Sequence, residues 1–468
     1  MLTRDLVRVL AVAVFGIALV FGAGARAQVA DMKTLKDEFN NPEARKNLSE
    51  LIKGEREPKK EDQKLLDATA RWYIYRVGYK GWEAWNKEHP ADMATYHKDL
   101  EALVILVLGS SKDNKNRAFI DQLGPPFQKA FRDVFALELA SNQPAVINAA
   151  LMLPVVSRLK QEAVGDLLVE LLVDKDNKYH DAIKVYAAKA MGEFLPAHMW
   201  KFTDEPKDTK RKDKFNRDTA RFNALVKYIK SKSVDTLDEG ERDVIRYLRR
   251  EAIISLARTG VPALKSLKKE GKVEGPAAFE LLQILVKGEG EITPAPSLSE
   301  RVEAAIGLCY LQYPYGDNID YIDYDPSVAI YGIGLCFLDF ANEYSRDFVN
   351  LNNRNKKGEK ANTKEPVMAW RIQAERFKAG MEYFDKSTEK SKAHARAKAL
   401  RAEINPVADL IKDTKQLSDM VPITNKIAAL APADGKLYTL KDRKVTEEHD
   451  RLEINPAKLR GGAGAEGK

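Results

Sequence analysis

The sequence predicts an all-α protein, and three observations support this. Segments of about 12 to 20 residues carry apolar side chains at spacings of three and four, the pattern of an amphipathic helix. No convincing run alternates apolar and polar residues with a period of two, so no strand is expected. Prolines and glycines separate the segments, where helix ends and first turns are expected. The clearest helical segments are residues 61–77, 95–109, 162–174, 243–257 and 276–288.

The N-terminus, residues 1–27, has the features of a secretory signal peptide. Arg4 and Arg8 form a short positive region, an apolar stretch follows at 9–21, and a small-x-small sequence ends at Ala27. We therefore expect signal cleavage between Ala27 and Gln28. The alternative is an uncleaved membrane anchor, because the apolar stretch could be extended towards the roughly 20 residues that a spanning helix needs. Cleavage would leave an exported protein, periplasmic or extracellular, with no membrane insertion.

The mature chain is expected to contain four regions. A chain of 468 residues is long enough for several domains or for one elongated array. Residues 28–142 form a non-repetitive helical region, and 143–350 contain helices that resemble one another. Residues 351–430 form a basic helical region. The glycine-rich end of 431–468 indicates a largely disordered tail.

The central helices share small residues at corresponding positions. Ala187 and Ala190 occupy such positions in one helix, and Ala252 and Ala257 do so in another, each followed by a glycine. This pattern resembles the HEAT family, whose second helix reads like V-R-x-x-A-x-x-A-L-x-x-x-G. The resemblance implies an irregular HEAT-like (armadillo-type) α-solenoid with helical N- and C-terminal extensions, in which each helix pair buries its apolar face on its neighbours. An α/α toroid is the alternative architecture.

The two cysteines lie in matching stretches, "IGLCYL" at Ile306–Leu311 and "IGLCFL" at Ile333–Leu338. The match predicts corresponding helices of successive units, with Cys309 and Cys336 at a small, buried, apolar position. A disulfide stays open as an alternative. Export favours the bond, but neighbouring helix axes lie about 8–10 Å apart and a disulfide needs Cα atoms within roughly 7 Å. Two cysteines without a clustered histidine do not indicate a zinc site.

A segment rich in tyrosine and aspartate, residues 310–331, separates these two stretches. Tyrosines interleaved with carboxylates suit the recognition of a sugar or a basic peptide. The alternative is an ordinary helix-connecting loop, with turn residues and a helix that opens at Pro326. The candidate binding residues are Tyr313, Tyr315, Asp317, Asp320, Tyr321, Asp323 and Tyr324.

The charge distribution does not indicate a nucleic-acid partner. The formal net charge is +7 over the whole chain, a modest excess that is widely spread. Three local basic stretches occur at 207–214, 352–360 and 390–401. The first two have no hydrophobic periodicity, which predicts solvated loops, and the third predicts an exposed basic helix.

No familiar catalytic motif occurs in the sequence. The six histidines have no metal-ligand spacing, and no nucleophile elbow, Walker loop or dinucleotide fingerprint is found. We therefore expect no metal and no cofactor, and the favoured function is a non-catalytic protein-interaction scaffold with a protein partner. The alternative is a cell-wall or carbohydrate-binding module, or a carbohydrate-active enzyme, that uses residues 310–331 to bind glycan.

Overall fold

The structure, a computed structural model, is helical throughout the part of the chain that it describes. All regular elements there are helices, and no strand occurs among them, which confirms the predicted all-α class. Within the same residues, no helix has both the length and the apolar character that a membrane crossing requires. The described residues are 37–39, 41–76, 90–110, 115–137, 139–174, 176, 178–195, 209–230, 238–260, 277–285, 292–311, 326–356, 364–389, 393–417 and 420–430.

The chain divides into two compact units, residues 1–197 and residues 198–468. The predicted boundary between 142 and 143 falls inside a helix of the first unit, and the one between 350 and 351 falls inside a helix of the second. The helices of the first unit are α3 (Pro42–Lys53), the short 3₁₀ helix η2 (Lys60–Asp62), α4 (Gln63–Tyr75), α6 (Pro90–Gly109), α7 (Arg117–Phe135), α8 (Leu139–Ser157), α9 (Glu162–Val173) and α10 (Asp181–Phe194).

In the first unit each helix packs on helices close to it in the sequence. Helix α7 contacts α4, α8 and α9, and α10 contacts α8 and α9. The side chains of Phe127 and Phe131 on α7 are completely buried in this core. Burial of such aromatic rings stabilises the unit, since each fully buried phenylalanine contributes about 1.5–3 kcal/mol of hydrophobic free energy.

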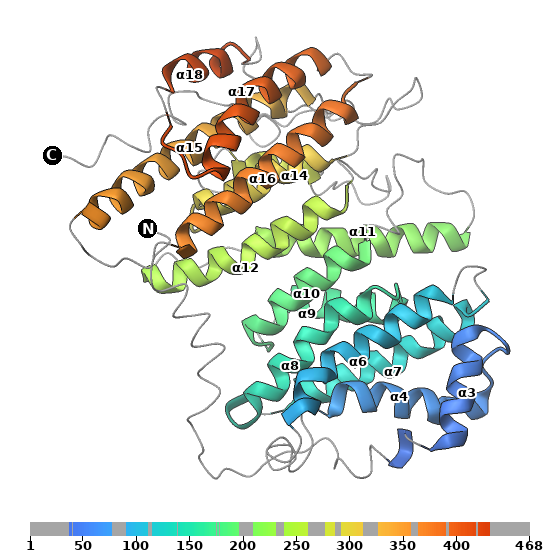
Figure 1. Cartoon of the computed structure of the whole chain (residues 1–468). Helices are drawn as coiled ribbons and strands as arrows, with labels where there is room; N and C mark the ends of the chain where they lie inside the picture. Colours follow the sequence, from blue (N-terminus) through green and yellow to red (C-terminus); the bar gives the residue numbers. More distant parts are fainter. Residues whose placement is uncertain are drawn as a thin grey trace. The chain divides into compact units, whose positions relative to one another are not determined.

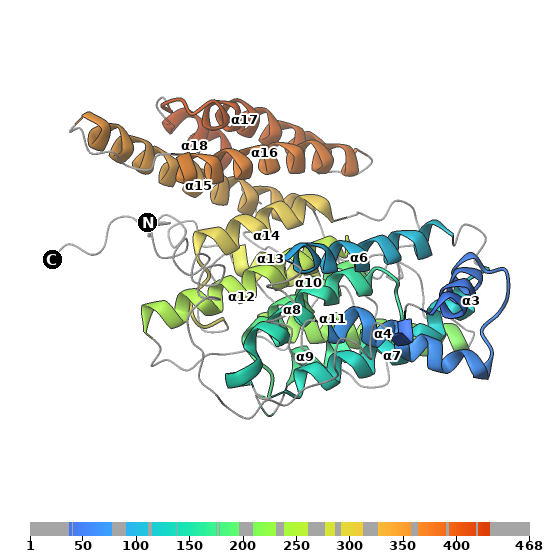
Figure 2. The same ribbon diagram turned by 60° about the horizontal axis from the view of Figure 1, so that its bottom comes forward.

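The second unit has the same kind of neighbour-on-neighbour packing. Helix α14 contacts α12, α13, α15 and α16, and residues 300–309 of α14 are all buried. Helices α16 and α17 run side by side, as Figures 1 and 2 show. The helices of this unit are α11 (Thr209–Ile229), α12 (Glu239–Arg258), α13 (Ala277–Leu285), α14 (Leu298–Tyr310), α15 (Pro326–Lys356), α16 (Lys364–Ser387), α17 (His394–Lys412) and α18 (Val421–Ala428).

The small residues singled out in the sequence are buried, and one of them, Ala257, lies at a close helix contact. Ala187, Ala190 and Ala252 are completely buried. A Cβ atom added to Gly307, in the stretch "IGLCYL", would lie 2.6 Å from the Cβ of Ala257. Real Cβ atoms do not approach so closely, so α12 and α14 can pack at this distance only because position 307 has no side chain.

The second glycine of the matching pair has the same role. A Cβ on Gly334, in "IGLCFL", would lie 2.7 Å from Ile427 Cγ2 and 3.0 Å from Leu400 Cδ1. Helix α15 therefore approaches α17 and α18 closely at that point. The two matching stretches belong to α14 and α15, which pack on each other.

The basic stretches differ in part from their predictions. Helix α11 begins at Thr209 and α15 continues to Lys356, so helices extend into both stretches predicted as loops. Lysine and arginine have good helix propensity, which explains how a helix continues through them without an apolar face. The third stretch is helical in α17, but this helix is not simply exposed, because Ala397 and Leu400 are completely buried.

Candidate functional site

Most of the tyrosine- and aspartate-rich segment lies outside the described residues, and its flanks are described. None of the seven candidate binding residues between 313 and 324 is placed by the structure. On one side, α14 ends with the partly exposed Tyr310 and the buried Leu311. On the other side, α15 begins at Pro326, where the sequence predicts a helix start. The structure thus fixes the two points between which the segment runs.

Tyr310 forms an aromatic pair with Tyr383 of α16, and we call these two residues the Tyr310 edge. Their ring centroids lie 5.3 Å apart, and 37% of Tyr310 is exposed. Gly380 makes the contact close, because a Cβ there would lie 3.2 Å from Cys309 Cβ and 3.8 Å from Tyr310 Cε2. The Tyr310 edge therefore presents a rigid aromatic surface next to the start of the segment.

Behind this edge lies an ionic cluster that joins three helices. Glu303 of α14 is 2% exposed, and its carboxylate accepts hydrogen bonds from Arg376 of α16 at 2.8 and 2.5 Å. Arg250 of α12 donates to the same carboxylate at 2.6 Å, and Gln373 of α16 donates at 3.3 Å. These four residues are the Glu303 cluster. One buried carboxylate thus connects α12, α14 and α16.

The electrostatics of the Glu303 cluster keep it charged. Burial alone would raise the pKa of Glu303, but the hydrogen bond from Arg376 and the charges of Arg250 and Arg376 outweigh burial and hold this pKa below its usual value. Burial raises the pKa of Tyr310, and Arg376 opposes that rise. Tyr310 is therefore a neutral hydroxyl at physiological pH, able to donate and accept hydrogen bonds.

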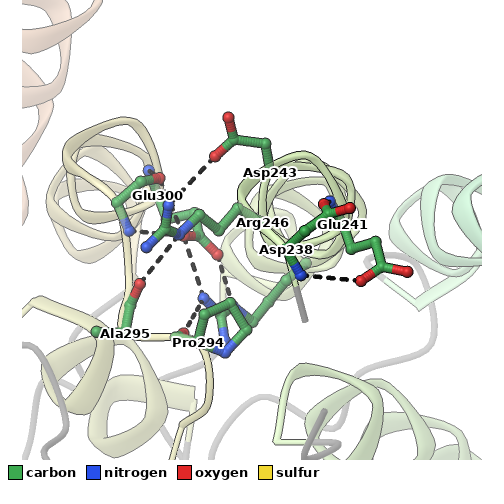
Figure 3. A network of polar contacts seen from close by, with 9 residues as sticks. Asp238, Glu241, Asp243, Arg246, Pro294, Ala295 and Glu300 are labelled. Carbon is green, nitrogen blue, oxygen red and sulfur yellow. Dashed lines mark hydrogen bonds and ion pairs between the residues drawn. The ribbon is translucent and has the colours of Figure 1, made fainter. Parts of the chain in front are cut away.

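A second buried ion pair connects α12 to the start of α14 (Figure 3). Arg249 donates to Glu300 Oε1 at 2.5 Å and to the carbonyl oxygen of Pro294 at 2.8 Å. Glu300 also accepts from the backbone N–H of Ser297 at 2.7 Å, as the N3 residue of a capping box. Arg246 adds an exposed bond to the carbonyl oxygen of Ala295. These contacts fix the helix that carries Tyr310 at its other end.

The two cysteines are free thiols in this structure, and both are completely buried. Cys309 Sγ lies 3.9 Å from Met381 Sδ. Burial raises the pKa of both thiols, and raises that of Cys336 to about 12. Protonated, enclosed thiols are poor nucleophiles and poor metal ligands, so these cysteines act as small apolar side chains.

An open groove of about 230 Å³ lies between α16 and α17. Alanines line part of it, and ion pairs between the two helices border it. Lys378 and Asp409 approach to 2.8 Å, and Lys412 and Glu375 to 3.5 Å. Glu382 of α16 also lines the groove, so the groove carries charges of both signs. Across the described ranges, no three His, Cys, Asp or Glu side chains gather as metal ligands would.

Sequence reasoning singled out the segment as a candidate, which stays a prediction, and missed the side chains that support its flank. Glu303, Arg376, Gln373 and Tyr383 were not singled out. The usable signal was a pair of glutamates, Glu300 and Glu303, in a helix that is otherwise strongly apolar over its last two turns. A charged residue on the buried face of such a helix requires a partner from a neighbouring helix.

Comparisons with known proteins do not place the chain in a family. No family model matches the sequence. No curated protein and no solved structure matches it either.

Proposed function

We propose that this protein is an exported, non-catalytic scaffold that binds another protein through the Tyr310 edge and the segment that follows it. The proposal includes an irregular HEAT-like solenoid. What supports the solenoid is the packing of helices on sequence neighbours and the close contacts at Gly307 and Gly334. Arrays of this kind present long surfaces to partners.

The observation that carries the proposal is the partly exposed aromatic pair of Tyr310 and Tyr383 on a rigid support. Tyrosine is enriched at protein interfaces because its ring is apolar and its hydroxyl is polar. Only two of its side-chain torsion angles lose freedom on binding, so the entropy loss is small. The Glu303 cluster holds both helices that carry the pair, so little conformational entropy would be lost on binding. Further tyrosines and aspartates between 312 and 325 would extend this surface.

Export is part of the same proposal. The positive region, apolar stretch and small-x-small site at residues 1–27 support a secreted precursor. Mass spectrometry of the protein recovered from the envelope or the medium tests this directly. We expect an N-terminus at Gln28, and a recovered protein that retains residues 1–27 would indicate the membrane-anchor alternative.

Affinity capture from the envelope fraction of the source organism tests the binding function. The bait is tagged mature protein, beside the variants Tyr310→Ala/Tyr383→Ala and Tyr321→Ala/Tyr324→Ala. We expect one protein to be recovered in stoichiometric amount and to be lost with both variants. The matched control is Ile105→Ala/Leu106→Ala, which removes exposed apolar side chains in the other unit and should leave capture unchanged.

The competing function, glycan binding, has its own readout in that experiment. Aromatic residues interleaved with carboxylates also suit sugars, so the same baits are incubated with purified peptidoglycan. Retention on peptidoglycan that the tyrosine variants abolish, without a protein partner, would replace the scaffold proposal with a carbohydrate-binding one. Capture that survives both tyrosine variants would place the interface elsewhere.

A further inference from the structure

Helix α16 carries a row of side chains along one outer face. The positions of the row are spaced alternately four and three residues apart, which keeps side chains on one face of a helix. The side chains of Met368 and Ile372 are 57% and 48% exposed, although both are apolar. Glu382 is partly exposed, and the other members of the row are exposed. We call this set the α16 row: Met368, Ile372, Glu375, Ala379, Glu382 and Lys386.

The α16 row borders the groove between α16 and α17. Glu375, Ala379 and Glu382 of the row line this groove, and alanines of both helices line much of the rest. Alanine side chains are short, so another helix can approach α16 closely at this point. Met368 and Ile372 continue the same face over about two helical turns before Glu375. The groove and the two apolar side chains together form an elongated surface that fits a further helix.

The charges along this surface complement themselves. Arg371 and Lys378 are seven residues apart, so they lie along one edge of the row, and they alternate in sequence with Glu375 and Glu382. The order of signs is therefore positive, negative, positive, negative. If two copies of α16 lie antiparallel, with the point between residues 376 and 377 at the centre, Arg371 of one copy lies opposite Glu382 of the other. In the same register Lys378 lies opposite Glu375, and two-fold symmetry makes each pair occur twice.

The outer charges of this pattern, Arg371 and Glu382, are available for contacts between copies. Within the described ranges neither side chain makes an ion pair or a hydrogen bond. The inner charges differ, because Lys378 already lies 2.8 Å from Asp409 and Glu375 lies 3.5 Å from Lys412. Contacts between Arg371 and Glu382 therefore break no existing ion pair, and these two residues specify the register.

We propose that the occupant of this surface is a second copy of the chain, and that the protein forms a homodimer through antiparallel packing of α16 on α16. The register places Met368 of one copy opposite the alkyl stem of Lys386 of the other, and Ile372 beside Ala379. Both exposed apolar side chains are then covered. The contact involves little more than one helix face from each copy, so the dimer is weak, with a dissociation constant of about 10–100 µM.

Sedimentation velocity of the full mature chain tests the dimer. Between about 1 and 300 µM protein at low salt, we expect the sedimentation coefficient to rise from that of a monomer towards that of a dimer. The variants Arg371→Glu and Glu382→Arg each place like charges opposite one another, and each should weaken self-association at least about tenfold. An equimolar mixture of the two variants should associate again, because one supplies two acidic and the other two basic side chains at these positions.

The matched control reverses a charge away from this surface. Lys98→Glu changes an exposed lysine of α6 in the first unit and should leave self-association unchanged. Circular dichroism and a urea melt show whether each variant folds. A chain that stays monomeric up to about 300 µM would overturn the proposal. So would a dimer that neither charge reversal weakens, or a mixture of the two variants that associates no better than either one alone.

Discussion

Two charged residues, Glu303 in the second unit and Lys160 in the first, differ in whether an ion pair compensates their charge. In the second unit, Glu303 lies in the core and is bonded by Arg250 and Arg376 from two other helices. In the first unit, Lys160 is partly buried without an ion pair, on a backbone that also adopts an unfavourable conformation. The ion pairs of Glu303 therefore stabilise the fold. At Lys160, the unpaired charge and the backbone conformation both reduce the stability of the fold, and packing alone does not explain why they are retained.

The largest expected effect is at Glu303. The substitution Glu303→Gln leaves two arginines without their carboxylate, and we expect a loss of about 2–4 kcal/mol in the free energy of unfolding. This estimate is below that for a completely buried pair because both arginines are partly exposed. Urea denaturation followed by circular dichroism measures it. A loss under about 1 kcal/mol would mean that the Glu303 cluster does not hold the helices together.

The same residue makes a prediction for acid pH. The pKa of Glu303 is lowered in the folded state, so the stability it contributes is complete above its unfolded value of 4.5. That contribution is lost as the pH falls below 4.5 through the folded pKa. Unfolding curves between pH 7 and 3 should therefore show that Glu303→Gln lacks part of the acid-induced loss seen in the unmodified protein.

The second effect has the opposite sign and arises at Lys160. Lys160→Met keeps the apolar stem and removes the charge, so we expect stability to rise by roughly 1–3 kcal/mol at pH 7. The folded pKa of about 8 lies below the unfolded 10.5, so the unfolded chain binds more protons between these values. The unmodified protein should thus gain stability over this range relative to the variant. Equal pH slopes in both proteins would show that Lys160 is ordinarily solvated.

A smaller effect measures how much a left-handed backbone conformation reduces the stability of the protein. Thr414, after α17, also has a positive φ, 56°, and the N–H of Lys415 donates to the carbonyl oxygen of Leu410 in the manner of a helix C-terminus. Thr414→Gly should stabilise the protein by about 1 kcal/mol, since glycine adopts this conformation without strain. Thermal unfolding measures the gain. If Lys160→Gly gains no more than Thr414→Gly, strain alone accounts for the cost at Lys160.

The smallest effect is expected at the groove between α16 and α17. Glu375 and Lys412 lie 3.5 Å apart and both are about half exposed. Water and salt screen such a pair, so Glu375→Gln should change stability by about 0.5 kcal/mol or less. The variant serves as a matched control for Glu303→Gln, because each substitution removes one carboxylate at a helix contact. Glu375 lies between α16 and α17, and Glu303 lies between α14 and α16. A similar loss in both would indicate a general charge effect.

The sequence was sufficient for the helical class, and the repeated stretches that it contains mark two places of close helix contact. Gly307 and Gly334 stand in a repeated sequence, and the structure places both where a side chain would collide with a neighbouring helix. Such positions can be recognised in a sequence because close helix packing requires small residues, and these recur at helical spacing. The start of α15 at Pro326 was readable for a similar local reason.

The pairing of charged residues that lie far apart in the sequence could not be predicted. Glu303 and Arg376 are 73 residues apart, and only the folded arrangement of α14 and α16 shows that they meet. Lys160 gave no signal either, because its conformation results from the turn between α8 and α9 and from contacts with α7. Local sequence specifies helices well, whereas the pairing of charges depends on how the helices assemble.

The buried thiols of Cys309 and Cys336 allow the transient separation of α14 and α15 to be measured. A thiol reagent reaches neither sulfur while α14 and α15 remain packed, because both side chains have no exposed surface. The rate at which such a reagent labels the chain therefore counts the transient separations of these helices. It does so without any engineered probe, and it would show whether a partner bound at Tyr310 suppresses those separations.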